Sequence, residues 1–198
     1  MRPFNRLDAP DFLTENWEKW GNEYAARKTA NSNHVFQWKQ YQNQKVNQRL
    51  LPILREQTQQ HCSYCDFFPA RLGDDTIDHF RPKGDARFYH LAYYWNNLYF
   101  CCWHCQKAKN EQFDEVILQP DEPGYSFERY FVFNFSTGKI EVNPAAPDEE
   151  KLRAEVTIRL FGFNEEGQPF SRLHWLKHYQ LHPQPIDLEA FAFRFLFE

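Results

Sequence analysis

Apolar residues near the start of the chain recur with the spacing of an α-helix. Leu13, Trp17, Trp20 and Tyr24 stand at positions i, i+4, i+7 and i+11, so they share one face of a helix predicted over roughly 10–28. Such a stripe either joins the hydrophobic core or pairs with another helix.

The next segment, 34–60, combines many glutamines with an irregular apolar face, and it is predicted to be helical as well. Pro52 lies inside it. Because proline lacks an amide hydrogen and clashes with the preceding turn, we expect it to kink the helix or to begin a new one at its first turn. The apolar positions are Trp38, Tyr41, Val46, Leu50 and Leu54.

The centre of the chain changes from helical to strand-like spacing. Residues 76–80 and 98–101 predict two short strands, and a helix is predicted to follow through Lys109. The order is therefore strand, loop, strand and helix. Within the loop, the aromatic run 89–95 fits either an extended segment or a short helix, and its spacing does not decide between them.

The last third of the chain predicts a hairpin followed by three helices. Residues 127–143 alternate in polarity around a glycine-containing turn at 136–138. Helices are predicted over roughly 148–162, 169–181 and 187–197. The last is strongly apolar and fits either the core or a surface that binds a partner. The predicted apolar faces contain Leu152, Val156, Leu160 and Phe163 in the first helix, Phe170, Leu173 and Leu176 in the second, and Leu188, Phe191, Phe195 and Leu196 in the third.

Composition indicates a folded α+β protein. Of the 198 residues, 42% are hydrophobic and 18% aromatic, which is enough for a core. We expect an N-terminal helical extension (1–60), a central module (61–120) and a C-terminal hairpin with helices (121–198), packed on one another or as a single domain. No apolar run reaches the ~18–20 residues of a membrane span. The first residues lack an apolar leader, so a cytoplasmic location is expected.

Charge is distributed unevenly along the chain. The net charge is −4, yet residues 81–109 contain five basic side chains and one acidic, which gives this stretch +4 and leaves −8 for the rest. The overall acidity argues against a uniformly basic coat for nucleic acid. A local positive face on an acidic body instead fits a phosphate-binding site with a separate surface for a protein partner.

Four of the five cysteines form two Cys-x-x-Cys pairs, Cys62 with Cys65 and Cys102 with Cys105. Four thiolates grouped two and two suit the tetrahedral shell of a structural Zn²⁺. A redox or disulfide pairing is the alternative, but a cytoplasmic setting favours metal binding. The fifth, Cys101, stands outside the pairs and is expected to be a buried strand residue.

Asp78 and His79 stand between the two cysteine pairs. Hydrolysis of a phosphodiester needs an activated water, neutralisation of the phosphate charge and help for the leaving oxygen, and one divalent cation supplies the last two. A neutral histidine can take the proton from the water. Because adjacent strand residues point to opposite sides, the pair is expected to act together only if the strand end is twisted or bulged. The alternative is a capping aspartate beside a surface histidine.

These motifs together resemble a known family. The segments CSYC, IDHFRPK, WNNL and CCWHC, followed by a lysine, resemble the HNH, or ββα-metal, endonucleases that carry a four-cysteine zinc. More closely, they resemble the HNH proteins of bacterial anti-phage systems, namely the nuclease subunit of Septu and retron-associated HNH proteins. The resemblance covers about 62–110, is weaker over 150–175 and does not extend to 1–60.

The resemblance implies a zinc-stabilised ββα-metal core with flanking α-helices and an extra β-hairpin. In that core, Asp78 would bind a catalytic Mg²⁺ or Mn²⁺, His79 would be the general base, and Asn97 would hydrogen-bond the loop and keep His79 oriented. The position after the last zinc cysteine usually carries Asn or His and completes the metal site. Here it is Gln106, whose extra methylene moves the amide oxygen by more than ~1 Å. Gln106 therefore binds the metal directly, acts through a water or leaves a weakened site.

Several basic residues are implied to contact phosphate groups of the substrate, although ordinary solvated charge is the alternative for each. They are Arg81, Lys83, Lys107 and Lys109. His90 is a further candidate in the loop, where it either reaches the scissile phosphate or faces solvent.

The function implied is that of a metal-dependent endonuclease that cuts DNA, with RNA as a second possible substrate. By resemblance to Septu, an ATPase partner in an anti-phage complex would regulate or deliver it. The aromatic helices at 10–28 and 187–197 are where that contact is expected. Two alternatives stand beside this function: a non-catalytic zinc-binding adaptor for nucleic acid or protein, and a stand-alone restriction-type endonuclease.

Overall fold

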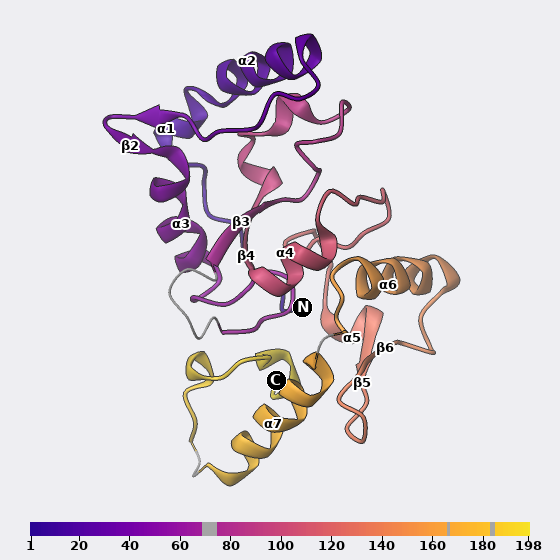
Figure 1. Cartoon of the computed structure of the whole chain (residues 1–198). Helices are drawn as coiled ribbons and strands as arrows, with labels where there is room; N and C mark the ends of the chain where they lie inside the picture. Colours follow the sequence, from indigo (N-terminus) through magenta and orange to yellow (C-terminus); the bar gives the residue numbers. More distant parts are fainter. Residues whose placement is uncertain (69–74, 166, 183–184) are drawn as a thin grey trace.

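A computed structural model describes residues 1–68, 75–165, 167–182 and 185–198. Within these ranges the chain has an α+β fold, as predicted, in which three two-stranded antiparallel sheets are distributed among helices (Figure 1). None of the described helices combines the length and the apolar character needed to cross a membrane. The helices are α1 (Asp11–Thr14), α2 (Trp17–Ala30), α3 (Val46–Gln57), α4 (Trp103–Lys109), α5 (Phe127–Tyr130), α6 (Asp148–Leu160) and α7 (Gln168–Leu181), and the strands are β1 (Gln40–Tyr41), β2 (Gln44–Lys45), β3 (Asp75–His79), β4 (Leu98–Cys102), β5 (Phe131–Phe133) and β6 (Ile140–Val142).

The hairpin β3–β4 and the helix α4 lie at the centre of the fold, between two hydrophobic cores (Figure 1). β3 and β4 pair along their whole length without a bulge. Every residue of β4 is buried: Leu98 and Phe100 join one core, and Tyr99 and Cys101 join the other. This division follows from the alternation of side chains along a strand. The predicted order of strand, loop, strand and helix is confirmed.

The first core forms where α1, α2 and α3 pack against one face of β4. The predicted stripe is confirmed at Leu13, Trp20 and Tyr24, which are buried, and the helix is interrupted for two residues after α1. In the loop between β3 and β4, the aromatic run 89–95 was predicted to be either extended or a short helix. It contains the 3-10 helix η1 (Tyr89–Leu91), which is followed by η2 (Trp95–Asn97). η1 packs against α2 at Gly21, where any side chain would overlap the loop backbone.

The helix predicted over 34–60 is wrong in its first half. Residues 40–45 form the short hairpin β1–β2, in which Gln42 and Asn43 adopt φ angles of 48° and 64°. Two consecutive residues with positive φ favour a tight two-residue hairpin turn. α3 begins only at Val46 and continues through Pro52 as one helix, so the proline does not start a new one.

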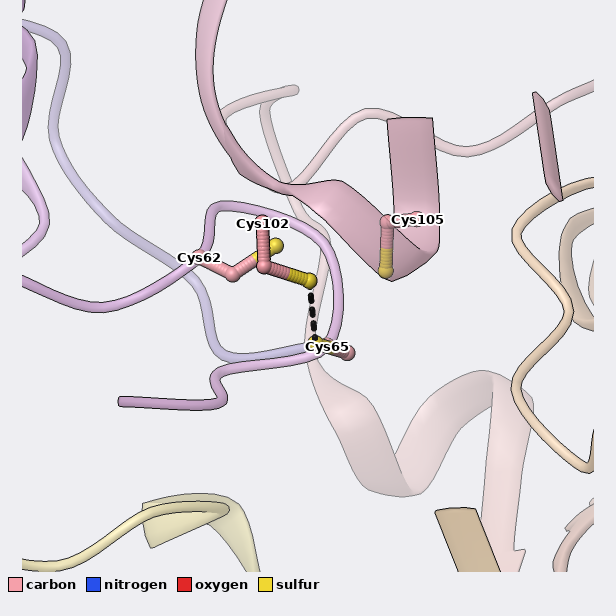
Figure 2. A group of neighbouring side chains, drawn as sticks. All are labelled: Cys62, Cys65, Cys102 and Cys105. Atoms are coloured by element: carbon pink, nitrogen blue, oxygen red, sulfur yellow. Dashed lines mark hydrogen bonds between the residues drawn. The ribbon is translucent and has the colours of Figure 1, made fainter. Parts of the chain in front are cut away.

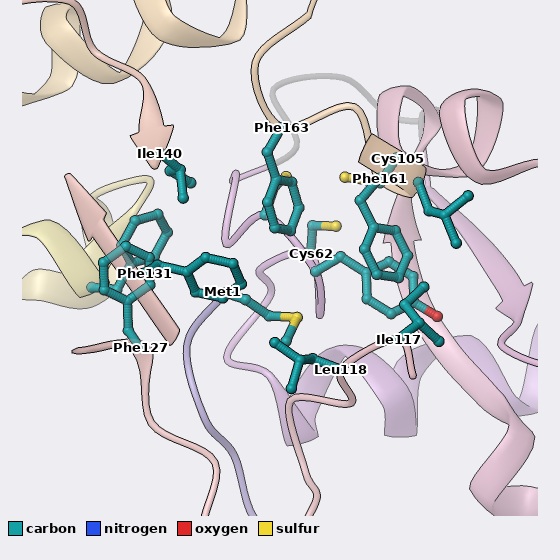
Figure 3. Close-up of a cluster of buried hydrophobic side chains, with 14 of the residues drawn as sticks. Met1, Cys62, Cys105, Ile117, Leu118, Phe127, Phe131, Ile140, Phe161 and Phe163 are labelled. Atoms are coloured by element: carbon teal, nitrogen blue, oxygen red, sulfur yellow. The ribbon is translucent and has the colours of Figure 1, made fainter. Parts of the chain in front are cut away.

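The second core lies between the central hairpin and the C-terminal half, and it includes the four paired cysteines. Figure 3 shows two of them, Cys62 and Cys105, among the apolar side chains. The hairpin predicted over 127–143 is confirmed as β5–β6, but its first part forms the helix α5 instead of a strand. Aromatic rings supply much of the packing, and they include Phe127, Tyr130, Phe131, Phe161 and Phe163.

The spans predicted for α6 and α7 are confirmed, but their predicted faces are only partly correct. Leu152 is 50% exposed and Phe170 is 75% exposed. The fully buried residue of α7 is Arg172, whose guanidinium donates to the carbonyl oxygens of Gly138 and Phe163, each at 2.7 Å. A pattern built on apolar residues does not detect a buried arginine with backbone partners.

The α-helix predicted over 187–197 is wrong. This tail contains two 3-10 helices, η3 (Leu188–Ala190) and η4 (Arg194–Leu196). Phe191, Phe193 and Phe195 are at most 6% exposed, so the tail belongs to the core and does not present them to a partner. Arg194 secures it through a buried ion pair with Asp66, with 2.6 Å between Nη2 and Oδ1.

Candidate metal centre and adjoining cavity

The four paired cysteines meet in one cluster (Figure 2). Their sulfur atoms all lie within 4.8 Å of one another, and those of Cys65 and Cys102 are 3.6 Å apart. Cys62 and Cys65 come from the turn that follows α3, whereas Cys102 ends β4 and Cys105 lies in the first turn of α4. The cluster therefore joins two segments that are distant in the sequence.

The chemistry of the cluster fits a metal ion. The four side chains are at most 4% exposed, and none is in a disulfide. Zinc–sulfur bonds of ~2.3 Å in a tetrahedron require sulfur separations of roughly 3.8 Å, which is within the observed range. Burial raises the pKa of the Cys65 and Cys105 thiols, so a metal must displace protons when it binds. Four buried cysteines are thus positioned to hold one ion.

The remaining cysteine and the nearby histidines make other contacts. Cys101 is fully buried on β4 and lies outside the cluster, as predicted. The ring nitrogens of His61 lie 2.5 and 2.8 Å from the backbone oxygens of Gln59 and Phe191. His104 Nε2 lies 3.0 Å from the backbone oxygen of Gly162. The donor set is therefore the four paired cysteines.

A cavity of about 310 Å³ lies beside β3 and α4, next to the cysteine cluster. It brings together residues that are far apart in the sequence and that were predicted to act together. Asp78 and His79 line it from β3, Gln106 and Lys107 from α4, and Lys83 from the loop between the strands.

Asp78 is held firmly at one of its two oxygens. The side chain is buried, the Tyr64 hydroxyl donates to Oδ2 at 2.8 Å, and the Lys109 ammonium lies 3.1 Å from the same oxygen. Oδ1 accepts no hydrogen bond from the described residues.

His79 packs on the opposite face of β3 from Asp78. Its imidazole contacts the rings of Phe36 and Trp38, with centroid distances of 5.2 and 5.5 Å, and the Trp38 indole is stacked on it. β3 has no bulge that would turn the two side chains to one side. Both nevertheless border the cavity, because β3 is an edge strand whose free side faces it.

The hydrogen bonding of His79 defines its tautomer. Nε2 lies 2.9 Å from the backbone oxygen of Ala92, and since a carbonyl can only accept, Nε2 carries the proton. Nδ1 then keeps its lone pair. Burial, with smaller contributions from Lys83 and Lys109, lowers the pKa of His79 to about 3. The imidazole is therefore neutral at pH 7, and Nδ1 is its unprotonated nitrogen.

Asn97 connects the two ends of the loop that carries Ala92. Its side-chain oxygen accepts from the Arg81 amide at 2.7 Å, and its Nδ2 donates to the backbone oxygens of Arg81 and Leu91 at 3.0 and 3.1 Å. The residue is fully buried. These contacts fix the loop beside the carbonyl that orients His79.

The phosphate contact expected for Lys109 is wrong, because its side chain is 0% exposed. Its ammonium pairs with Asp78 and donates to the backbone oxygen of His79 at 2.8 Å. Lys83 and Lys107 do line the cavity, and Lys83 pairs there with Glu111 at 3.1 Å. Arg81 and the exposed His90 are not among the cavity-lining residues.

Sequence reasoning missed three residues near the candidate site. Glu111 lines the cavity and accepts from the Gly84 amide at 2.9 Å, and Trp103 lines it as well. Trp38 reaches His79 from the N-terminal segment. Glu111 lies two residues after the basic stretch and stands out by its charge, and Trp103 stands out by its place between two cysteines. No signal in the sequence connects Trp38 with His79.

No protein-family model matches the chain, and no curated protein matches it at a significant level.

Proposed function

We propose that this protein is a metal-dependent endonuclease of the HNH type that hydrolyses phosphodiester bonds in DNA. The observation that carries the proposal is the neutral imidazole of His79, which shares a cavity with the carboxylate of Asp78 and with Lys83 and Lys107. A proton acceptor, a cation ligand and phosphate-binding charges are the groups that this reaction needs.

The cysteine cluster would hold a structural Zn²⁺. A site closed by four thiolates leaves no position for water or substrate, so the ion would serve the fold and not the reaction. Since Cys102 ends β4 and Cys105 lies in α4, the ion would fix the angle between the central hairpin and the helix that carries Gln106. It would thereby set the width of the cavity.

The donor set beside His79 fits a hard divalent cation. Asp78 Oδ1 and the amide oxygen of Gln106 are hard ligands, and Mg²⁺ in nucleic-acid enzymes commonly keeps only one or two protein ligands. When bound, Mg²⁺ or Mn²⁺ would neutralise charge on the phosphate and assist the leaving oxygen.

The protein groups would supply the rest of the chemistry. Nδ1 of His79 accepts a proton from a water molecule, whose oxygen forms the new bond to phosphorus as the bond to the sugar oxygen breaks. The Ala92 carbonyl holds the imidazole in the required tautomer and stabilises the imidazolium that forms. Asn97 keeps that carbonyl in place through the loop.

Partner and setting follow from the resemblance to the Septu nuclease subunit. We propose a cytoplasmic anti-phage complex in which an ATPase partner delivers or regulates the nuclease. The phenylalanines of the tail and the apolar stripe of α1 and α2 are buried, so the partner would contact the solvent-exposed side chains of α1 and α2. The cavity is small, which is consistent with a partner that supplies target selection.

The test is a plasmid-nicking assay with Mg²⁺ or Mn²⁺, with and without the co-purified partner and ATP. His79→Ala should lower nicking by at least ~100-fold, the usual contribution of a general base. His90→Ala is the matched control, because His90 is exposed and does not line the cavity. Gln106→Asn, which restores the residue type usual in the family, should retain or raise activity. Undiminished nicking by His79→Ala would refute the mechanism.

One observation favours a second candidate, a non-catalytic zinc-binding adaptor. Lys109 already places a positive charge 3.1 Å from Asp78, where a catalytic cation would compete for the same carboxylate. In that case the wild-type protein would bind nucleic acid without cutting it under any metal or partner condition.

A further inference from the structure

Trp103 is an exposed aromatic residue at the edge of the candidate site. It is the first residue of α4 and stands between the cluster residues Cys102 and Cys105. Its side chain is 53% exposed and lines the same cavity as Asp78 and His79. The other five tryptophans are buried or half-buried. An indole left in solvent beside a cavity with cationic side chains is available to a ligand.

The ring is not required by the packing of either core. Trp103 belongs to neither of the two hydrophobic clusters. Its backbone position is set by the neighbouring cysteines and by α4, so the indole itself adds little to that arrangement. The Lys107 ammonium lies 4.8 Å from the ring centroid, one helical turn further along. The cation therefore lies over one face of the indole, and both residues line the cavity.

This pairing matches the two parts of a nucleotide. Lysine neutralises a phosphate, and a tryptophan face stacks on a base whatever its identity. The second cavity lysine, Lys83, lies in the loop between the strands and pairs with Glu111, which also lines the cavity, so cationic side chains border it from two elements. Base stacking on a side chain requires a base whose face is not already covered by its neighbours in a duplex.

From this arrangement we infer that Trp103 stacks on an unpaired base next to the scissile phosphate, so that the substrate is single-stranded or locally unpaired DNA. The inference rests on the proposed function and adds the class of substrate. In a continuous duplex each base is covered on both faces, and the indole would remain outside the stack. A strand that enters without pairing can place a base against the indole and its phosphates near the lysines.

The first test compares cleavage of a labelled single strand with cleavage of the same strand in a duplex. Wild-type protein should prefer the single strand. Trp103→Ala should lower kcat/KM on the single strand by about 5- to 150-fold, which corresponds to the loss of one stacked base. Trp103→Phe should retain most of the activity, because a smaller aromatic plane remains. Since the indole is exposed, Trp103→Ala should keep the wild-type thermal transition.

A strand that lacks one base separates stacking from other effects. Moving a single abasic site along the strand should reveal one position, beside the cut, at which wild-type cleavage falls by a factor similar to that of Trp103→Ala. At that position Trp103→Ala should show no additional loss, since the same contact is already absent. Additive losses at every position would overturn the inference.

Two further outcomes would also overturn it. Equal cleavage of duplex and single strand by the wild-type protein would remove the substrate preference. Loss of activity in Trp103→Ala only when a protein partner is present would assign the indole to a protein contact. An RNA strand cut with the same dependence on Trp103 would support stacking and extend the substrate to unpaired RNA.

Failure of the proposed function is detected separately by a binding experiment. His79→Ala, which should not cleave, is titrated with strands that carry 2-aminopurine at successive positions. Quenching of the probe at one position, lost in His79→Ala combined with Trp103→Ala, would support stacking even if no condition gives cleavage. Binding without any dependence on Trp103 would overturn the inference while leaving the nuclease proposal standing.

Discussion

Replacing Lys109 with methionine removes the ammonium that pairs with Asp78 and donates to the His79 carbonyl. Lys109 and Asp78 are 0% and 4% exposed, so the change leaves a buried carboxylate with Tyr64 as its remaining hydrogen-bond donor. Removing one partner of a buried ion pair costs about 3–5 kcal/mol. For a chain of this length, each kcal/mol shifts the melting temperature by about 2–4 °C. Lys109→Met should therefore melt about 6–20 °C below the wild-type protein.

Thermal unfolding followed by circular dichroism measures this shift, with Lys107→Met as the control. Lys107 lies on the same helix but is exposed, so its replacement should change stability by no more than about 0.5 kcal/mol. If Asp78 binds a divalent cation, Mg²⁺ at 100 times its Kd should restore about 2.7 kcal/mol to Lys109→Met. Equal melting temperatures for the two variants would refute the reasoning, because Asp78 would then not be a buried charge that depends on Lys109.

Two further predictions concern the cysteine cluster and the response to acid. Each chain should contain one zinc ion, measured by elemental analysis. Cys65→Ser should lower zinc affinity and unfold the second core. A metal-free protein that keeps the wild-type melting temperature would contradict this prediction. Stability should fall as the pH drops from about 6.5 towards 3, because His79 has a pKa of about 3 when folded while the unfolded chain takes up a proton near 6.5. Across this window His79 lowers the free energy of unfolding by about 1.4 kcal/mol for each unit of pH decrease. In His79→Gln this part of the pH dependence should be absent, which denaturant titrations between pH 4 and 6 measure. An unchanged slope would show that His79 titrates normally.

The central module was largely predictable because its residues are linked by local spacing. Two cysteine pairs, an Asp-His pair and two short strand-like segments predict a strand, loop, strand and helix, and the structure has β3, β4 and α4 in that order. The same spacing correctly predicted that the four paired cysteines lie together in one cluster. It did not identify Lys109 as a buried residue, because a lysine is buried only when a partner such as Asp78 is present in the tertiary structure.

The errors outside this module have a common physical cause. The tail at 187–197 has apolar residues at helical intervals, yet it folds as two 3-10 helices that place three phenylalanines in the core. Residues 34–39 were predicted to be part of a polar helix, but they are not helical, and the rings of Phe36 and Trp38 pack against His79. In both segments, contacts with distant residues outweigh local propensity, and single-sequence patterns do not contain those contacts.

The ion pair between Asp66 and Arg194 has a consequence for the order of events during synthesis. The two residues are 128 positions apart, and the Phe193 amide also donates to the Asp66 carbonyl at 2.8 Å. Asp66 directly follows Cys65, so the first cysteine pair gains its last packing partners only after residue 194 has left the ribosome. Until residues 193 and 194 are available, the segment that carries Cys62 and Cys65 therefore remains incompletely packed.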